Sequence, residues 1–178
     1  MKTNIALIGF MGTGKTAVGQ VLAKRLNMAF IEMDSLISSK AGKTIPQIFE
    51  EDGEIGFREL EIEIAKRASA EQHAVIACGG GAVLNWINIE RLRETSVIVL
   101  LTASPAETMK RVSKEVGQRP LLEGQDPLTR IREMLKSRQP FYQRAADITV
   151  NTSRRTIASV ADAIIKELKE DASFDWPE

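Results

Sequence analysis

Residues 9–16 read Gly-Phe-Met-Gly-Thr-Gly-Lys-Thr, a complete phosphate-binding loop of the pattern G-x-x-x-x-G-K-[ST]. The apolar run 3–8 before the loop is typical of a buried strand, and Val18, Val21 and Leu22 after it recur at helical spacing. Between a strand and a helix, such a loop can bind phosphate through its backbone N–H groups and the helix N-terminus. The alternative is an ordinary glycine turn followed by a lysine. The flanking pattern favours binding of a nucleoside triphosphate.

Each part of this loop has a distinct expected partner. The Lys15 ammonium can reach the β- and γ-phosphates, and the Thr16 hydroxyl can ligate the Mg²⁺ that accompanies ATP. The glycines allow backbone N–H groups to turn toward the phosphate oxygens. The residues that we expect to contact ATP here are consecutive: Gly12, Thr13, Gly14, Lys15, Thr16 and Ala17.

Composition narrows the range of functions. The chain has 178 residues, of which 43% are hydrophobic and 27% charged, and its 24 basic and 24 acidic side chains cancel. We therefore expect neither nucleic acid nor an anionic membrane as a partner. Cys78 is the single cysteine, which excludes an internal disulfide and favours a reducing, cytoplasmic location. We expect no secretory leader, and no run of about 20 apolar residues predicts a membrane span.

Apolar segments alternate with helical periodicity along the chain. The strand-like segments are residues 3–8, 28–32, 73–78, 96–101 and 147–150. The predicted helices are residues 15–26, 34–40, 46–52, 56–69, 87–94, 105–113, 127–140 and 156–169. This alternation predicts an α/β sandwich around a parallel sheet, with ligands at the carboxyl ends of the strands. We expect a single domain over residues 1–170, and a tail at 171–178 that frays unless its two aromatic residues dock.

Residues 112–126 interrupt this alternation, because they show little periodicity and contain two glycines. A long irregular segment in a compact domain is typical of a functional lid. A lid that closes over a phosphate would expel water and bring in a positive charge, for which Arg119 is the candidate. The alternative is a solvated arginine in a flexible loop.

Two acidic residues, Glu32 and Asp34, follow the second strand-like segment. At the carboxyl end of a strand they would lie beside the phosphate loop. One carboxylate can then hold Mg²⁺ through its water shell, while the other accepts a hydroxyl proton or binds a polyol. The alternative is a helix N-cap at Asp34 or Ser35 with another acid nearby.

Further candidates lie on either side of the third strand. Arg58 and Glu61 are three residues apart on a predicted helix, where a fixed guanidinium can bind a carboxylate; an exposed ion pair is the alternative. Residues 79–81 are three consecutive glycines directly after the strand, more than a tight turn needs, which favours close approach of a ligand to the backbone. We expect Cys78 to be buried and inert, and His73 to be a surface residue.

The last candidates are cationic. Arg138 is a second possible anion clamp, although a cation at this position could instead complement the dipole at a helix C-terminus. Residues 151–155 form a strand-to-helix turn that could face an adenine, or serve only to cap a helix through Ser153 or Thr156.

Taken together and in this order, the motifs resemble shikimate kinase over nearly the whole chain, from Ile5 to about Leu168. The motifs are the phosphate loop, Ile45-Pro46-x-Ile48-Phe49, Phe57-Arg58-x-x-Glu61, Gly79-Gly80-Gly81-Ala82-Val83, Arg119-Pro120-Leu121-Leu122 and Arg138-x-x-x-Tyr142. The resemblance implies a three-layer sandwich with a five-stranded parallel sheet, similar to the nucleoside-monophosphate kinases, and a mobile lid. It also implies transfer of the γ-phosphate of ATP to the 3-hydroxyl of shikimate, in aromatic amino-acid biosynthesis, by a monomer.

The resemblance also implies roles for individual residues. Asp34 would bind the reacting hydroxyl and act as its base, while Lys15 and Arg119 would complete the catalytic set. Arg111 would stack on adenine, with the turn that contains Arg155 on the other side. Thr16 and Glu32 would hold the Mg²⁺ ion. The expected substrate-binding residues are Asp34, Arg58, Glu61, Gly79, Gly80, Gly81 and Arg138, with Glu61 orienting Arg58.

One residue departs from the pattern of this family. The family usually has Asp-x-Asp where this chain has Glu32-Met33-Asp34, and the extra methylene would move the Glu32 carboxylate by about 1 Å relative to the metal's water shell. We expect activity to survive because Asp34 is retained. Two other interpretations are a related kinase for gluconate or a nucleoside monophosphate, and a nucleotide-binding module without turnover.

Overall fold

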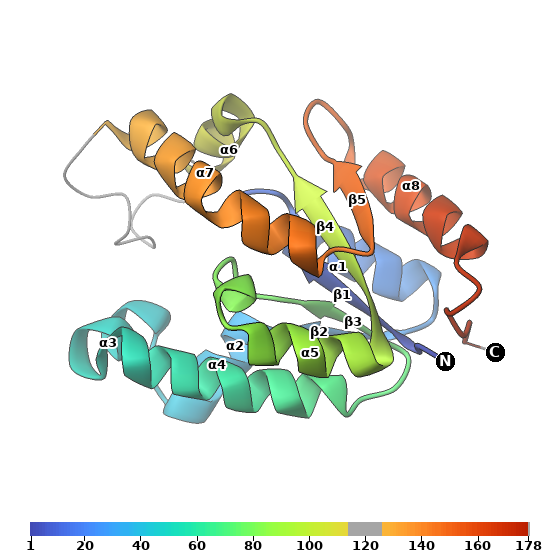
Figure 1. Ribbon diagram of the computed structural model, residues 1–178, viewed down its shortest axis with the longest axis horizontal. Helices are drawn as coiled ribbons and strands as arrows, with labels where there is room; N and C mark the ends of the chain where they lie inside the picture. The colour runs from blue at the N-terminus through green and yellow to red at the C-terminus, as the bar shows by residue number, and fades with distance from the viewer. Residues whose placement is uncertain (114–125, 178) are drawn as a thin grey trace.

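A parallel five-stranded sheet forms the centre of the protein in a computed structural model, which describes residues 1–113 and 126–177 (Figure 1). The strands are β1 (Asn4–Ile8), β2 (Ala29–Glu32), β3 (Ala74–Ala77), β4 (Ser96–Thr102) and β5 (Ile148–Asn151). Their order across the sheet is β2-β3-β1-β4-β5, and every neighbouring pair is parallel. The strand that carries the phosphate loop is therefore central, and both its neighbours end beside the loop.

Helices cover both faces of the sheet. They are α1 (Lys15–Arg25), α2 (Met33–Ala41), α3 (Ile45–Glu51), α4 (Gly53–Ser69), α5 (Trp86–Thr95), α6 (Pro105–Val112), α7 (Pro127–Ala145) and α8 (Ile157–Glu170), with a short 3₁₀ turn η1 (Ala82–Leu84). In Figure 1, α1 and α8 lie side by side on one face, while α2 to α5 and α7 lie across the other. The expected three-layer sandwich is thereby confirmed.

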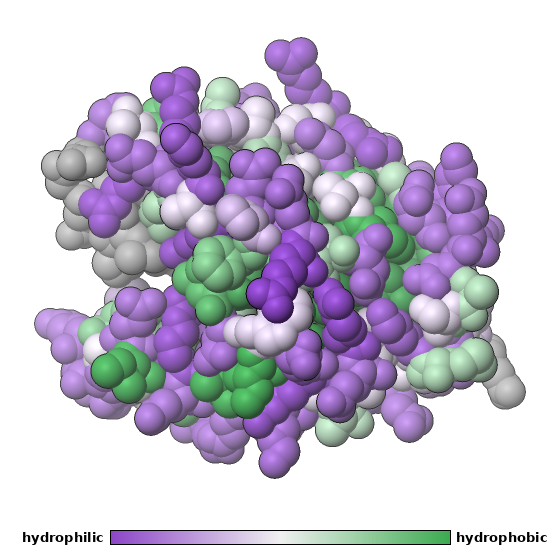
Figure 2. All heavy atoms as spheres, in the orientation of Figure 1, coloured by the Kyte–Doolittle hydropathy of each residue, from purple (hydrophilic) through white to green (hydrophobic). Residues whose placement is uncertain are grey.

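The layers arise from the two-residue period of the strands. Ile5 and Leu7 of β1 point into the core shared with α1 and α8, whereas Ala6 and Ile8 point into the other core. Because a strand alternates its side chains between faces, a central strand must be apolar at every position to serve both cores. On the face shown in Figure 2, hydrophilic side chains predominate and apolar ones form small separate patches.

Side-chain caps define where several helices begin. Thr44 and Gln47 form a reciprocal capping box at the start of α3, and Asn85 accepts a hydrogen bond from the Ile87 N–H at the start of α5. Such caps satisfy N–H groups that have no partner within the helix. Thr156 caps α8 in the same way, which confirms one of the two alternative capping residues named for the turn after β5.

Helix α7 is longer than expected. The sequence predicts its end at residue 140, yet it runs through Pro140 to Ala145. A proline removes one hydrogen bond from a helix interior, but Tyr142 and Ala145 beyond it are buried in the core. We infer that this packing outweighs the local preference to stop.

The C-terminal residues pack against the start of the chain. Phe174 is buried in the α1–α8 core and meets Trp176 edge to face at 5.0 Å. The Lys2 N–H donates to the Ser173 carbonyl, and the Asp175 N–H donates to the Lys2 carbonyl. The two aromatic residues therefore dock. Among the residues described, no helix combines the length and apolar character that crossing a bilayer requires.

Candidate active site

The phosphate loop joins β1 to α1, as its sequence predicts. Gly12 and Gly14 have φ angles of +71° and +94°, a region that side chains with a Cβ rarely adopt, and Gly14 is the N-cap of α1. The Lys15 ammonium donates to the carbonyls of Gly9 at 2.9 Å and Phe10 at 3.0 Å. The loop is thus preformed, with the N-terminus of α1 directed at the space in front of it.

A pocket of about 1560 Å³ opens in front of this loop, at the carboxyl ends of the strands. Every site residue predicted from the sequence within the described part of the chain lines it. These residues are Gly12, Thr13, Gly14, Lys15, Thr16, Ala17, Glu32, Asp34, Arg58, Glu61, Gly79, Gly80, Gly81, Arg111, Arg138 and Arg155. Arg119 and most of the proposed lid lie outside the described residues.

On one side of the pocket, Arg111 of α6 connects the phosphate loop to the turn after β5. Its Nη1 donates to the Gly12 carbonyl and to the Thr152 hydroxyl, both at 3.0 Å, and its Nη2 donates to the Thr152 carbonyl at 2.9 Å. Arg155 donates to the Ser159 carbonyl at 2.8 Å. Ser153, the second capping candidate, instead accepts from the Ser104 N–H.

Glu32 lies at the end of β2, where its carboxylate accepts a hydrogen bond from the Thr16 hydroxyl. Burial raises the pKa of Glu32, and the nearby Asp34 carboxylate raises it further, while Thr16 and Lys15 act in the opposite direction. Its Oε2 atom is buried without a hydrogen-bond partner among the described residues. A carboxylate oxygen and a hydroxyl side by side fit a cation such as Mg²⁺, which commonly uses few protein ligands together with phosphate oxygens. The described residues contain no larger cluster of metal ligands.

Asp34 lies in the first turn of α2, which begins at Met33 with Glu32 as its N-cap residue and without a side-chain cap. The alternative of an N-cap at Asp34 or Ser35 is therefore wrong. A Cβ on Gly79 would lie 2.8 Å from the Asp34 Oδ1 atom. The first glycine thus leaves room for this carboxylate at the pocket wall.

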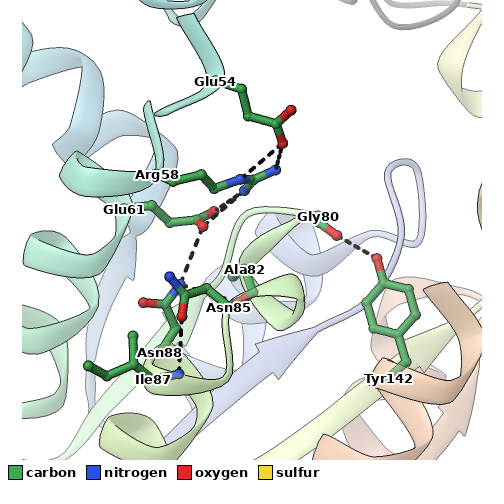
Figure 3. A network of polar contacts seen from close by, with 9 residues as sticks. All are labelled: Glu54, Arg58, Glu61, Gly80, Ala82, Asn85, Ile87, Asn88 and Tyr142. Atoms are coloured by element: carbon green, nitrogen blue, oxygen red, sulfur yellow. Dashed lines mark hydrogen bonds and ion pairs between the residues drawn. The ribbon is translucent and has the colours of Figure 1, made fainter. Parts of the chain in front are cut away.

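Arg58 is held by two carboxylates of its own helix, as Figure 3 shows. Its Nη1 donates to both oxygens of Glu61, at 3.1 and 2.9 Å, and its Nη2 donates to Glu54 at 3.2 Å. Glu61 is only 1% exposed, which excludes the alternative of a fully exposed ion pair. A Cβ on Gly81 would lie 2.7 Å from both terminal nitrogens of Arg58. The third glycine therefore leaves room for the guanidinium in this position.

Arg138 and Tyr142 are one helical turn apart in α7. The Arg138 guanidinium lies 5.8 Å from the centre of the Phe10 ring. Arg138 is in the middle of α7 rather than in its last turn, so the alternative that it complements the dipole at the helix C-terminus is wrong. The Tyr142 hydroxyl donates to the Gly80 carbonyl at 2.5 Å. Burial raises the pKa of Tyr142 to about 12, so this hydroxyl keeps its proton. Helix α7 thereby holds the glycine turn from the side opposite Arg58.

Two residues were expected to be inactive, and of these Cys78 lies at the pocket wall whereas His73 does not line the pocket. Cys78 is 1% exposed, and burial raises the pKa of its thiol, as expected of an inert cysteine. His73 is partly exposed at the start of β3, the end of that strand away from the pocket.

Sequence reasoning missed Asn88 and gave no individual role to Thr152, within the turn at 151–155, or to Tyr142, within the Arg138 motif, although all three position parts of the site. Asn88 and Thr152 are almost fully buried, at 0% and 3% exposure. A signal existed for Asn88, since it lies four residues before the core residue Leu92 and thus on the apolar face of α5. A polar residue on such a face needs hydrogen-bond partners.

Glu61 gives the stability of the fold an expected dependence on pH. Burial raises its pKa above the usual 4.5, and the opposing effect of Arg58 only partly offsets this. The folded protein therefore keeps this proton at pH values where the unfolded chain has released it. The contribution of Glu61 to stability is full below the unfolded pKa and declines as the pH rises through the folded pKa.

We expect Glu61→Gln to remove this decline. Urea unfolding between about pH 4 and pH 7 would show a free energy of unfolding that falls with pH more steeply in the original protein than in the variant. Glu63→Gln, an exposed change on the same helix, should keep the original slope. Equal slopes in the original protein and Glu61→Gln would contradict the assignment.

The fold and the pocket together define a class of protein. A phosphate loop on the central strand of a parallel sheet, facing a carboxylate and two arginines across one pocket, defines a P-loop kinase that phosphorylates a small molecule. Comparison with known proteins identifies the family. The family model described as shikimate kinase matches residues 11–169.

Individual relatives agree with this match. The shikimate kinase of Symbiobacterium thermophilum is 45% identical over 94% of this chain and 97% of its own length. That of Caldanaerobacter subterraneus is 48% identical over 92% of this chain and 94% of its own. A solved shikimate kinase from Acinetobacter baumannii in complex with shikimate superimposes with a TM-score of 0.92 at 34% identity, covering 97% of this chain and 96% of that one. The chain belongs to the shikimate kinase family, and it is a kinase that acts on an alcohol group.

Proposed function

We propose that this protein transfers the γ-phosphate of ATP to the 3-hydroxyl of shikimate and releases shikimate 3-phosphate and ADP, within the shikimate pathway. The observation that carries the proposal is the composition of one pocket wall. Asp34, Arg58, Arg138 and the glycine turn all line the pocket that also contains Lys15. This set suits a compact polyol that has one carboxylate.

Arg58 and Arg138 are the proposed clamp for the acceptor's carboxylate. They approach the pocket from α4 and α7, on opposite sides of the glycine turn. A guanidinium binds a carboxylate through paired hydrogen bonds, and two of them fix its orientation as well as its position. Because Gly81 has no side chain, it allows Arg58 to lie directly against the turn, so acceptor and backbone can meet closely.

The opposite part of the pocket is proposed to bind the nucleotide. The phosphate loop would hold the phosphates, while Arg111 and Arg155 border the site of the adenine. Thr16 and Glu32 would hold Mg²⁺, which neutralises phosphate charge when bound. Arg119, outside the described residues, is proposed to close onto the phosphates from the lid. We also propose that the active form is a monomer. We place this activity in the cytoplasm.

In the proposed reaction, the 3-hydroxyl oxygen of shikimate attacks the γ-phosphorus of ATP while the Asp34 carboxylate accepts the proton of that hydroxyl. The new O–P bond forms in line with the breaking bond to the β-phosphate oxygen, and ADP leaves with that electron pair. Lys15 stabilises the negative charge that accumulates on the transferring group. The protein contributes mainly positioning and positive charge, which is what such transfers require.

A coupled assay for ADP release tests this proposal. MgATP would be supplied with shikimate, quinate, gluconate or no acceptor, to the original protein and to Arg58→Ala. We expect release with shikimate only. Arg58→Ala should raise the KM for shikimate roughly 10- to 100-fold, the value of a charge-assisted contact, and leave the KM for ATP nearly unchanged.

Arg67→Ala is the matched control, because Arg67 lies on the same helix and is exposed. Release with gluconate or another acceptor would overturn the assignment of shikimate but keep a kinase. Equal increases in both KM values for Arg58→Ala would overturn the carboxylate clamp. ATP binding without release above background would favour a module without turnover.

A further inference from the structure

Asn88 is a fully buried polar residue that the proposed reaction does not use. It lies on α5, at 0% exposure, and its Nδ2 group faces two acceptors (Figure 3). One is the Glu61 Oε2 atom at 3.3 Å, and the other is the Ala82 carbonyl at 3.2 Å. An amide nitrogen carries two hydrogens, so each bond engages one of them.

Burying Asn88 lowers the stability of the fold unless its hydrogen bonds compensate. Its Oδ1 atom is buried without a hydrogen-bond partner among the described residues. Leaving a buried acceptor unsatisfied is unfavourable, and the apolar residues Ile89 and Leu92 fill the neighbouring core positions of the same helix. Packing alone would therefore accept an apolar side chain at position 88. The two bonds of Nδ2 must be where its contribution lies.

Those two bonds join both parts of the acceptor site. The Glu61 oxygen that accepts from Asn88 also accepts from Arg58 Nη1 at 2.9 Å. Ala82 directly follows Gly81, whose backbone lies against the Arg58 guanidinium. A closed path of contacts thus runs from the glycine turn through Asn88 and Glu61 to Arg58 and back to the turn.

Without Asn88, Arg58 would keep its ion pair with Glu61, but Glu61 would no longer be hydrogen-bonded to α5. Among the residues that the structure describes, Glu61 would then keep hydrogen bonds only to Arg58 of its own helix, and a carboxylate on a two-methylene side chain has several rotamers. Glu54, the other partner of Arg58, is exposed and holds it weakly. Small displacements of an orienting group reduce binding sharply, because the clamp must match the carboxylate in position and angle.

We propose that Asn88 is a positioning residue for recognition of the acceptor's carboxylate: it fixes Arg58 relative to the glycine turn through Glu61. This inference rests on the proposed function, in which Arg58 binds that carboxylate. It extends that function to a residue on α5, a helix that contributes no side chain to the lining of the pocket.

The test compares Asn88→Leu with the original protein in the ADP-release assay. Leucine has the same number of side-chain heavy atoms as asparagine and branches at the same carbon, and it removes both donors. We expect the KM for shikimate to rise about tenfold, the size of typical couplings within one polar network, with the KM for ATP unchanged. With the carboxamide analogue of shikimate, which has no carboxylate charge, we expect no difference between the two proteins.

Asn85→Ala is the matched control. Asn85 caps the same helix, where its side chain accepts a hydrogen bond from the Ile87 N–H, so loss of this side chain should lower the melting temperature and leave both KM values unchanged. If Asn88→Leu does not fold, Asn88→Ser, which shortens the side chain and removes the amide, takes its place. Melting curves for all variants separate changes in binding from loss of folded protein.

A double-mutant cycle completes the experiment. In the Arg58→Ala background, Asn88→Leu should no longer change the KM for shikimate, because Asn88 acts through Arg58. Two results would overturn the role of Asn88 while leaving the clamp intact, provided that Arg58→Ala shows its selective effect. One is an equal effect of Asn88→Leu on the KM for shikimate and the KM for ATP, and the other is an equal effect on the KM for shikimate and for its carboxamide. If Arg58→Ala shows no selective effect, the clamp itself is overturned and this inference with it.

Discussion

Lys15→Met is expected to lower kcat by about 1000-fold or more while the protein remains folded, because it removes the positive charge that we propose stabilises the transferring phosphoryl group. Methionine keeps most of the length of the side chain and loses only its charge and its hydrogen bonds. In the structure, the Lys15 ammonium bonds to the carbonyls of Gly9 and Phe10, so it lies across the mouth of its own loop. That position is in front of the N-terminus of α1, where phosphate oxygens are expected.

The measurement is kcat from the ADP-release assay, with circular dichroism and a melting curve to establish that the variant is folded. Lys24→Met is the control, since Lys24 is an exposed lysine near the other end of α1. It removes the same charge from the same helix at a distance from the pocket, and we expect normal turnover. An ordinary kcat for Lys15→Met would contradict the role of the phosphate loop.

Asp34→Asn is expected to lower kcat by about 100- to 10,000-fold, the range found for loss of a general base. Asparagine has nearly the same shape and can still bind the hydroxyl, so the KM for shikimate should change little. The close approach of the Asp34 carboxylate to Gly79 makes this substitution preferable to a larger one. An effect on kcat without an effect on KM would distinguish proton transfer from simple acceptor binding.

Ser35→Ala provides the comparison for Asp34→Asn. Ser35 is the next residue of the same first helical turn and is exposed, so its replacement perturbs α2 without touching the pocket. Both variants should be measured at saturating ATP and a range of shikimate concentrations. A kcat within a few-fold of the original for Asp34→Asn would exclude Asp34 as the base.

The parts of the site that were predictable from the sequence are those in which the chemistry fixes the residue types at positions close together in the chain. The phosphate loop needs glycines at positions with positive φ, and the structure has Gly12 and Gly14 there. The three glycines after β3 were expected to allow close approach of a ligand. Two of them prove to make room for side chains of the protein itself, namely Asp34 and Arg58. The prediction identified the correct residues but only part of the physical reason.

Features that depend on tertiary packing could not be predicted in this way. Nothing local to Glu61 distinguishes a buried carboxylate from an exposed member of an ion pair, because its burial depends on α5 packing against α4. The continuation of α7 past Pro140 likewise depends on where Tyr142 finds its partner, the Gly80 carbonyl. In both cases the deciding contact lies tens of residues away in the sequence, beyond the reach of periodicity or propensity.

The central position of β1 has a consequence for how such an enzyme can change. With β3 and β2 on one side of it and β4 and β5 on the other, most of the proposed acceptor wall and the proposed adenine site come from different parts of the chain, and Arg138 of α7 completes the acceptor wall. Mutations in α3 and α4 can therefore alter which alcohol is accepted with little effect on phosphate transfer, whereas Asp34 of α2 is proposed to serve both. The architecture separates selectivity from energy supply, and a designer or natural selection can vary the first without having to rebuild the second.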